Sequence, residues 1–93
     1  MNGRRIIYRT HAVQRMFERG INTADIRRVL EVEDVIEAYP NDKPYPSRLL
    51  LGTVSGRPLH VVAADNPTAE ETFIITVYEP DPERWDRSFR RRR

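Results

Sequence analysis

The spacing of apolar residues changes once along this chain, near residue 33, and this change limits the folds available to it. Before that point apolar side chains recur with the period of a helix that has one buried face. After it they alternate with polar side chains or form short β-branched runs, as strands do. A chain of 93 residues ordered in this way predicts one α+β domain, with helices first and a sheet second.

Two short helices are predicted in the first third of the chain. The first covers about residues 11–19, with Thr10 as its N-cap and Gly20 as the residue that ends it. The second begins after a cap at Thr23, and Asp25 lies in its first turn, where the helix dipole favours a carboxylate. The expected buried stripes are Ala12, Val13, Met16, Phe17 and Gly20 in the first helix, and Ile26, Val29 and Leu30 in the second.

Four strands are predicted after the helices, at residues 34–39, 47–54, 58–64 and 72–78. Residues 4–9 form a further short strand or an extended arm, and a short helix near residues 82–89 is expected to close the domain. We therefore expect the two N-terminal helices on one face of a twisted four-stranded antiparallel sheet. Residues 1–89 would form this single domain, and the arginine run 90–93 is predicted to be a disordered basic tail.

Arginine supplies almost all the positive charge of the chain: 16 residues are basic and 14 are acidic, and Lys43 is the only lysine. Guanidinium groups bind phosphates and stack on bases, so this composition is compatible with nucleic acid, and equally with an arginine-rich genome. The chain has no cysteine, which excludes disulfides and thiolate metal sites and favours a reducing cytoplasm. No apolar run is long enough for a signal peptide or a membrane span, so we expect no membrane association.

Charged side chains gather on one flank of the first predicted helix. On a helical wheel, the flank beside the apolar stripe holds His11, Arg15, Glu18 and Arg19. An ion pair between Arg15 and Glu18 would explain part of this charge without any function. His11 is different, because the positive end of the helix dipole disfavours an imidazolium in the first turn. A neutral imidazole is the form that a general base needs, so this flank is a candidate site.

A second histidine lies in the strand predicted at residues 58–64. If the strands align without a register slip, His60, Thr76 and Tyr78 meet on the side of the sheet away from the main core. The alternative is a half-buried structural histidine beside a packing tyrosine. Metal-free RNA cleavage needs a base for the 2′-hydroxyl, cations for the transition state and an acid for the leaving 5′-oxygen. Two histidines without cysteine make a poor metal site, so no metal or cofactor is expected.

A series of short motifs between Tyr8 and Trp85 resembles a bacterial family catalogued as a domain of unknown function, number 4258. In chain order the motifs are HAVQRMFERGI, ADIRRVL, VIEAYP, LLLG, RPLHVV and IITVY. The family is similar in layout to the RelE, ParE and MqsR group of toxins, in which helices pack on a twisted antiparallel sheet.

The resemblance implies a type II toxin: a metal-independent endoribonuclease that acts on mRNA and is paired with a zinc-finger antitoxin of the YgiT or MqsA type. It implies catalytic roles for His11, His60 and Tyr78, and substrate binding by Arg15, Arg19 and Thr76. The sequence does not decide which histidine is the base and which is the acid.

A non-catalytic module that binds RNA or a protein partner is the alternative, because ParE-like members are not nucleases. In an RNA-binding module, Tyr39 and Tyr45 beside the proline-rich loop at residues 40–46 would stack on unpaired bases. A homodimer, or an antitoxin segment that covers an apolar edge strand, fits either function.

Overall fold

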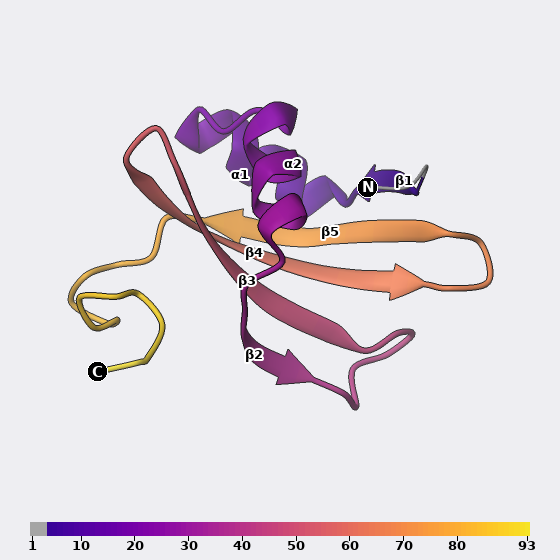
Figure 1. The fold of residues 1–93 in the computed structure, drawn as a ribbon. Coiled ribbons are helices and arrows are strands. Elements are labelled where there is room, and N and C mark those ends of the chain that lie inside the picture. The colour runs from indigo at the N-terminus through magenta and orange to yellow at the C-terminus, as the bar shows by residue number, and fades with distance from the viewer. Residues whose placement is uncertain (1–3) are drawn as a thin grey trace.

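The computed structural model describes residues 4–93, which form two helices and one five-stranded sheet (Figure 1). The elements are β1 (Arg5–Tyr8), α1 (Thr10–Arg19), α2 (Thr23–Val32), β2 (Val35–Tyr39), β3 (Ser47–Val54), β4 (Arg57–Asn66) and β5 (Glu71–Tyr78). The strand order is β1-β5-β4-β3-β2, with β1 parallel to β5 and the other neighbours antiparallel. Within residues 4–93, no helix has the length and apolar character needed to cross a membrane.

The fold is α+β, but the predicted four-stranded antiparallel sheet is wrong, because β1 adds a fifth, parallel strand. In this pairing Ile6 lies opposite Thr72, and Tyr8 lies opposite Ile74. Side chains of Ile6 and Tyr8 also pack against the core, which holds the strand at the edge of the sheet. A parallel pair joins segments that are far apart in sequence, so no hairpin turn in the sequence predicts it.

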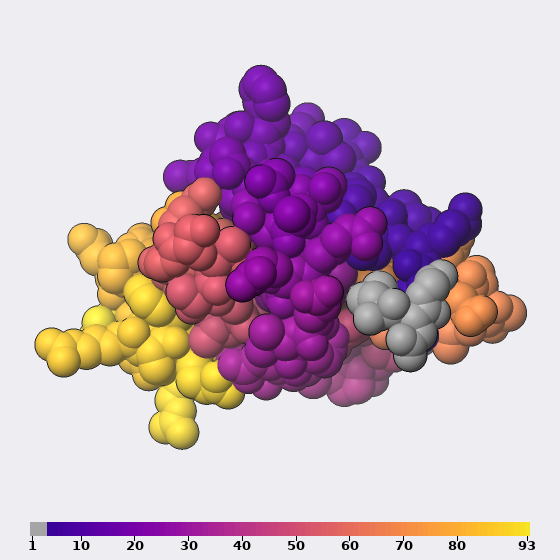
Figure 2. Space-filling view, turned by 45° about the horizontal axis from the view of Figure 1, so that its top comes forward, coloured from indigo at the N-terminus to yellow at the C-terminus, as the bar shows by residue number. Residues whose placement is uncertain are grey.

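The predicted C-terminal helix is also wrong, because the described chain after β5 has no regular helix. Pro82 suits the first turn of a helix, whose amides need no intrahelical acceptor, so the prolines do not explain the absence of the helix. One helical-type bond, from the Trp85 amide to the Asp81 carbonyl at 3.0 Å, forms before the chain turns away. Phe89 then takes a left-handed backbone conformation, with φ of 61°. Residues 81–93 instead fold back irregularly beside the sheet, as the yellow segment of Figure 2, and we call them the C-terminal strap.

The ends of the helices follow from local sequence. Gly20 ends α1 in the left-handed conformation with φ of 64°, as predicted. The cap of α2 is Asn22 and not Thr23, because the Asn22 side chain accepts from the Asp25 amide at 2.9 Å. The Asp25 carboxylate accepts in return from the Asn22 amide at 3.0 Å, which completes a capping box.

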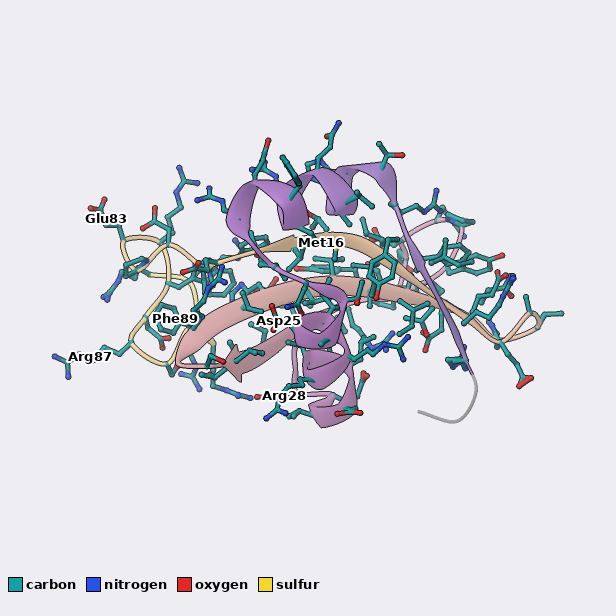
Figure 3. All side chains as sticks on the ribbon, turned by 90° about the horizontal axis from the view of Figure 1, so that it is seen from above. Met16, Asp25, Arg28, Glu83, Arg87 and Phe89 are labelled. Atoms are coloured by element: carbon teal, nitrogen blue, oxygen red, sulfur yellow. The ribbon has the colours of Figure 1, made fainter. Side chains whose placement is uncertain are left out.

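The core lies between the two helices and one face of the sheet. From α2 it takes Ile26, Val29 and Leu30, which are buried as predicted. From α1 it takes Ala12 completely and Met16 in part; Met16 is labelled in Figure 3. Val13 and Phe17 are 50% and 90% exposed, and Gly20 is exposed as well, so the predicted stripe of α1 is wrong at these three positions. α1 contacts β5 near the edge of the sheet, which leaves more of its surface in solvent.

Gly52 on β3 allows α2 to approach the sheet closely. A β-carbon at this position would lie 2.7 Å from Val29 Cγ2 and 3.3 Å from Val29 Cα. A larger residue therefore requires the helix to move. The two helices pack on this face of the sheet, against β3, β4 and β5, and we call the opposite face the helix-free face.

The substitution Gly52→Ala is expected to lower the free energy of unfolding by about 1–3 kcal/mol, because the added β-carbon overlaps Val29. Urea denaturation followed by circular dichroism measures this change. Thr53→Ala, at the exposed neighbour on β3, is the control and should change stability by less than about 0.5 kcal/mol. Equal losses at the two positions would contradict the close approach of α2 to β3.

Candidate functional site

A pocket of about 390 Å³ opens at one end of the helix-free face. The β1–α1 junction, the loop between β2 and β3, and the strands β4 and β5 all contribute to it. Its polar lining residues are Arg9, His11, Asp42 and Lys43, and its apolar ones are Pro44, Tyr45, Ala64, Phe73 and Ile75. We call it the Tyr45 pocket.

The apolar wall of the Tyr45 pocket contains an aromatic pair. The rings of Tyr45 and Phe73 are stacked, with centroids 5.8 Å apart and planes at 7°. The Arg9 guanidinium lies 5.0 Å from the centre of the Phe73 ring. Proteins bind single-stranded nucleic acid with this combination of a flat aromatic surface and a neighbouring arginine. The bases stack on the rings, and the phosphates bind the guanidinium group.

The polar rim of the pocket carries two permanent cations, Arg9 and Lys43, together with His11. His11 is exposed at the start of α1, where a ligand can reach it. Histidine is the side chain that most readily gains and loses a proton near neutral pH. Asp42 is the one carboxylate that lines the pocket, and its Oδ2 atom accepts a hydrogen bond from the Ser47 hydroxyl at 2.5 Å. The rim can thus hold an anion and move a proton.

His60 lies at the other end of the helix-free face, buried beneath the C-terminal strap. Its Nε2 atom is 2.8 Å from the Phe89 carbonyl oxygen, and its Nδ1 atom is 3.2 Å from the Tyr78 hydroxyl. Because a carbonyl only accepts, Nε2 carries the proton, and Nδ1 accepts from Tyr78. The Trp85 ring meets the imidazole edge to face, with centroids 4.5 Å apart. Both nitrogens of His60 therefore have hydrogen-bond partners.

Two arginines hold the strap against β2 and the residue before it. Arg90 pairs with Asp34 at 2.6 Å, and Arg92 pairs with Glu37 at 3.2 Å. The Arg92 guanidinium also lies 4.6 Å from the centre of the Trp85 ring. These arginines come from the run that was expected to be a disordered tail, and here they make defined contacts.

Burial and neighbouring charges shift the pKa values of the groups around His60. Burial lowers the pKa of His60 below its ordinary value of 6.5, and the positive charge of Arg92 acts in the same direction. The Phe89 carbonyl and Glu37 oppose this change in the pKa of His60. Burial and the neighbouring Glu37 raise the pKa of Tyr39, whose hydroxyl donates to Glu37 at 2.5 Å, to about 12.

A family model described as Domain of unknown function (DUF4258) matches residues 8–79. The chain belongs to the DUF4258 family. No curated protein and no solved structure matches it. The family predicted from the motifs is confirmed, whereas the similarity to RelE, ParE and MqsR toxins stays a prediction. The matched segment of the DUF4258 chain includes every residue that lines the Tyr45 pocket, and it ends before the strap.

The sequence leaves open whether His11 and His60 share one site, and the structure places them apart. The strand register places His60 opposite Tyr78 and Val62 opposite Thr76, so the histidine, threonine and tyrosine share the helix-free face. His11 lies apart from them, at the Tyr45 pocket. In this DUF4258 chain the two histidines thus line different sites.

The two arginines predicted on the α1 flank do not line the pocket. Arg15 lies 3.8 Å from Glu18, the ion pair expected for a solvated helix surface. The carbonyl of Arg19 accepts a hydrogen bond from the Arg57 guanidinium at 2.8 Å. Neither contact turns an arginine towards His11.

Sequence reasoning missed Arg9, Lys43 and Phe73 at the pocket. Among the pocket residues, His11 had a signal as a histidine in the first turn of a helix, and Tyr45 as an aromatic residue in a proline-rich loop. The other three come from a strand end, a loop and a strand, and meet only in the folded chain. Within residues 4–93, no group of three His, Asp or Glu side chains is placed to hold a metal ion.

The free energy of unfolding of this DUF4258 chain should decrease as pH drops below about 6.5, because of His60. In the folded state the pKa of His60 lies below its ordinary value of 6.5. As pH falls, the unfolded state therefore binds the proton first. His60 therefore contributes its full stabilisation above about pH 6.5, and this contribution is lost as pH falls through the folded-state pKa.

Urea denaturation between about pH 7.5 and pH 5.5 measures the effect, since most carboxylates titrate lower. The urea concentration at the unfolding midpoint of the wild type should fall as pH is lowered over this range. His60→Asn, which cannot titrate, should show a flatter dependence at lower overall stability. Parallel curves for the two proteins would contradict a buried neutral His60.

Proposed function

We propose that this DUF4258 protein binds single-stranded RNA in the Tyr45 pocket and cleaves it as a metal-independent endoribonuclease. The observation that carries the proposal is the convergence of three kinds of group in one cavity. A proton-transfer side chain (His11), two cations (Arg9 and Lys43) and a stacked aromatic pair all line it. The histidine and the cations are groups that RNA cleavage uses, and the aromatic pair is one that binding of single-stranded RNA uses.

Binding would combine stacking with phosphate contacts. A base that stacks on Tyr45 gains about 1–3 kcal/mol by the usual measure of alanine substitution. The adjoining phosphate would lie between Arg9 and Lys43, where guanidinium and ammonium groups neutralise it. A pocket of about 390 Å³ has room for one nucleotide unit, and its position at the end of the sheet leaves the rest of the strand free to continue along the helix-free face.

His11 would start the reaction as the general base. Neutral imidazole takes the proton of the 2′-hydroxyl, and the 2′-oxygen attacks the adjacent phosphorus. The bond from phosphorus to the 5′-oxygen breaks, which leaves a 2′,3′-cyclic phosphate. The departing 5′-oxygen takes a proton from solvent, which reaches the exposed rim. Arg9 and Lys43 would stabilise the extra negative charge on the transition state.

A toxin with this activity would arrest growth when produced in a cell. The antitoxin implied by the resemblance would then need a surface to bind. Val13 and Phe17 on α1, 50% and 90% exposed, offer an apolar contact of the kind that protein partners cover.

Non-catalytic binding of RNA is the second candidate function. The observation that favours it is that the Tyr45 pocket has one histidine, whereas efficient cleavage uses both a base and an acid. His60 lies under the strap and not in the pocket, so it does not supply the second group in this conformation.

The test measures binding and cleavage of a fluorescent single-stranded RNA, in the presence of a chelator, by purified wild type and variants. His11→Asn should reduce cleavage by about 10²–10⁴-fold and leave affinity nearly unchanged, because a general base contributes to the reaction and not to binding. Tyr45→Ala should weaken binding by about 1–3 kcal/mol through loss of stacking. Arg15→Gln is the control on the same helix, since Arg15 lies outside the pocket.

Three results would revise the proposal. Tight binding without cleavage by the wild type would leave the non-catalytic function. If a folded His60→Asn variant loses cleavage and the His11→Asn variant retains it, the catalytic site lies beneath the strap and not in the Tyr45 pocket. Absence of RNA binding at low salt would exclude both candidate functions, because phosphate contacts are strongest there.

A further inference from the structure

We propose that the C-terminal strap is an autoinhibitory cover that competes with a bound RNA strand for the helix-free face. The consequence for RNA rests on the proposed function, but docking of the strap can be measured without RNA. The proposal follows from where the strap lies, what it covers and how it is held.

The strap and the Tyr45 pocket occupy the same face of the same strands. On β4, Ala64 lines the pocket and His60 lies under the strap. Residues at even spacing share one face of a strand, so Val62 lies between them, opposite Thr76 of β5. Four residues of strand span about 13 Å. An RNA strand that leaves the pocket along β4 would therefore meet the strap after a short distance.

The strap covers a polar cluster that adjoins apolar side chains of β3, since the sheet register places Leu51 opposite His60. Beneath or beside it lie His60, Tyr78, Glu37 and Tyr39, which are joined to one another and to the strap by hydrogen bonds and an ion pair. Apolar side chains would fill such a permanently buried site at less cost in desolvation. A cluster of hydrogen-bonding groups on a sheet face is better suited to a cover that can be exchanged for another polar ligand.

The cover lies outside the family segment, whereas the cluster lies inside it. Residues 8–79 match the DUF4258 model, and this range includes all four residues of the cluster. The strap begins at Asp81. The domain therefore provides the polar surface on its helix-free face, and the additional segment covers it.

The contacts that hold the strap are of a kind that can open without unfolding the domain. The side chains in the two ion pairs are partly exposed: 47% and 32% for Arg90 and Asp34, and 61% and 29% for Arg92 and Glu37. Such pairs are weak and are screened by salt. Within residues 81–93 the only bridge of β type joins Trp85 to Arg92, so the strap adds no strand to the sheet. Segments with so few backbone bonds to the core are the ones that open locally.

Phosphate is the natural competitor for these contacts. Arginine binds phosphate and carboxylate oxygens by the same forked geometry. RNA that arrives from the Tyr45 pocket would draw Arg90 and Arg92 away from Asp34 and Glu37. Trp85 would then leave the imidazole of His60, and the polar cluster would be open to the RNA strand.

Trp85 reports the position of the strap, because it is the only tryptophan of the chain and is 3% exposed when docked. The test compares its emission and its quenching by acrylamide in three proteins. These are the wild type, a double variant that carries Asp34→Asn and Glu37→Gln, and a control double variant that carries Glu31→Gln and Glu83→Gln. The control removes the same charge, and neither of its glutamates forms an ion pair within residues 4–93. Figure 3 shows Glu83 at the outer side of the strap.

The Asp34→Asn, Glu37→Gln variant should show red-shifted emission and stronger quenching than the wild type and the control. It should also bind a single-stranded RNA oligonucleotide about three- to tenfold more tightly than the control, as expected from loss of two exposed ion pairs. Adding the RNA to the wild type should raise the quenching of Trp85.

Two results would overturn the proposal. Equal protection of Trp85 in all three proteins would show that the ion pairs do not hold the strap. RNA binding by the wild type that leaves Trp85 protected would show that the strap does not compete, and the proposed function would stand without it. If the opened variant exposes Trp85 but no protein binds RNA, the proposed function fails while the strap is still a releasable segment, and competition with RNA is excluded.

Discussion

Close packing of α2 on β3 is the interaction on which the arrangement of this protein depends. Gly52 has no side chain, so Val29 can lie against the strand. The two helices pack on one face of the sheet and leave the other face free of helices. The loop between β2 and β3 and the C-terminal strap cover parts of that face, and the Tyr45 pocket opens at one end of it.

The two histidines show how the same side chain takes opposite roles in one small domain. His11 begins a helix beside a loop, is exposed, and faces a pocket with cations and aromatic rings. His60 is fully buried, with both nitrogens in hydrogen bonds, and burial lowers its pKa. The first is open to solvent at a pocket, and the second is bonded to the C-terminal strap. Alternation along β4 correctly predicts the face that His60 occupies, but its burial depends on residues 81–93.

A shift in register between β4 and β5 decides which side chains reach the helix-free face. The pairing moves from Val62 opposite Thr76 to Ala63 opposite Ile74, so one extra residue of β5, Ile75, is accommodated. Thr76 and Tyr78 on one side of the shift, and Phe73 on the other, then lie on the same face as the pocket and the strap. Without the bulge these residues would lie on opposite faces, since successive side chains of a strand alternate. The bulge thus joins the aromatic wall of the pocket to the polar cluster under the strap.

Local patterns in the sequence determined the helix that ends at Gly20, the buried stripe of α2, the strand at residues 47–54 and the family of the chain. Each of these depends on neighbours within a few residues, or on motifs that can be compared directly. The tertiary structure alone decided the parallel pairing of β1, the irregular course of the strap, and the separation of His11 from His60. It also brought Arg9, Lys43 and Phe73 into one pocket. Contacts between segments that are distant in sequence leave no periodic pattern, because what places them is the packing of the whole sheet.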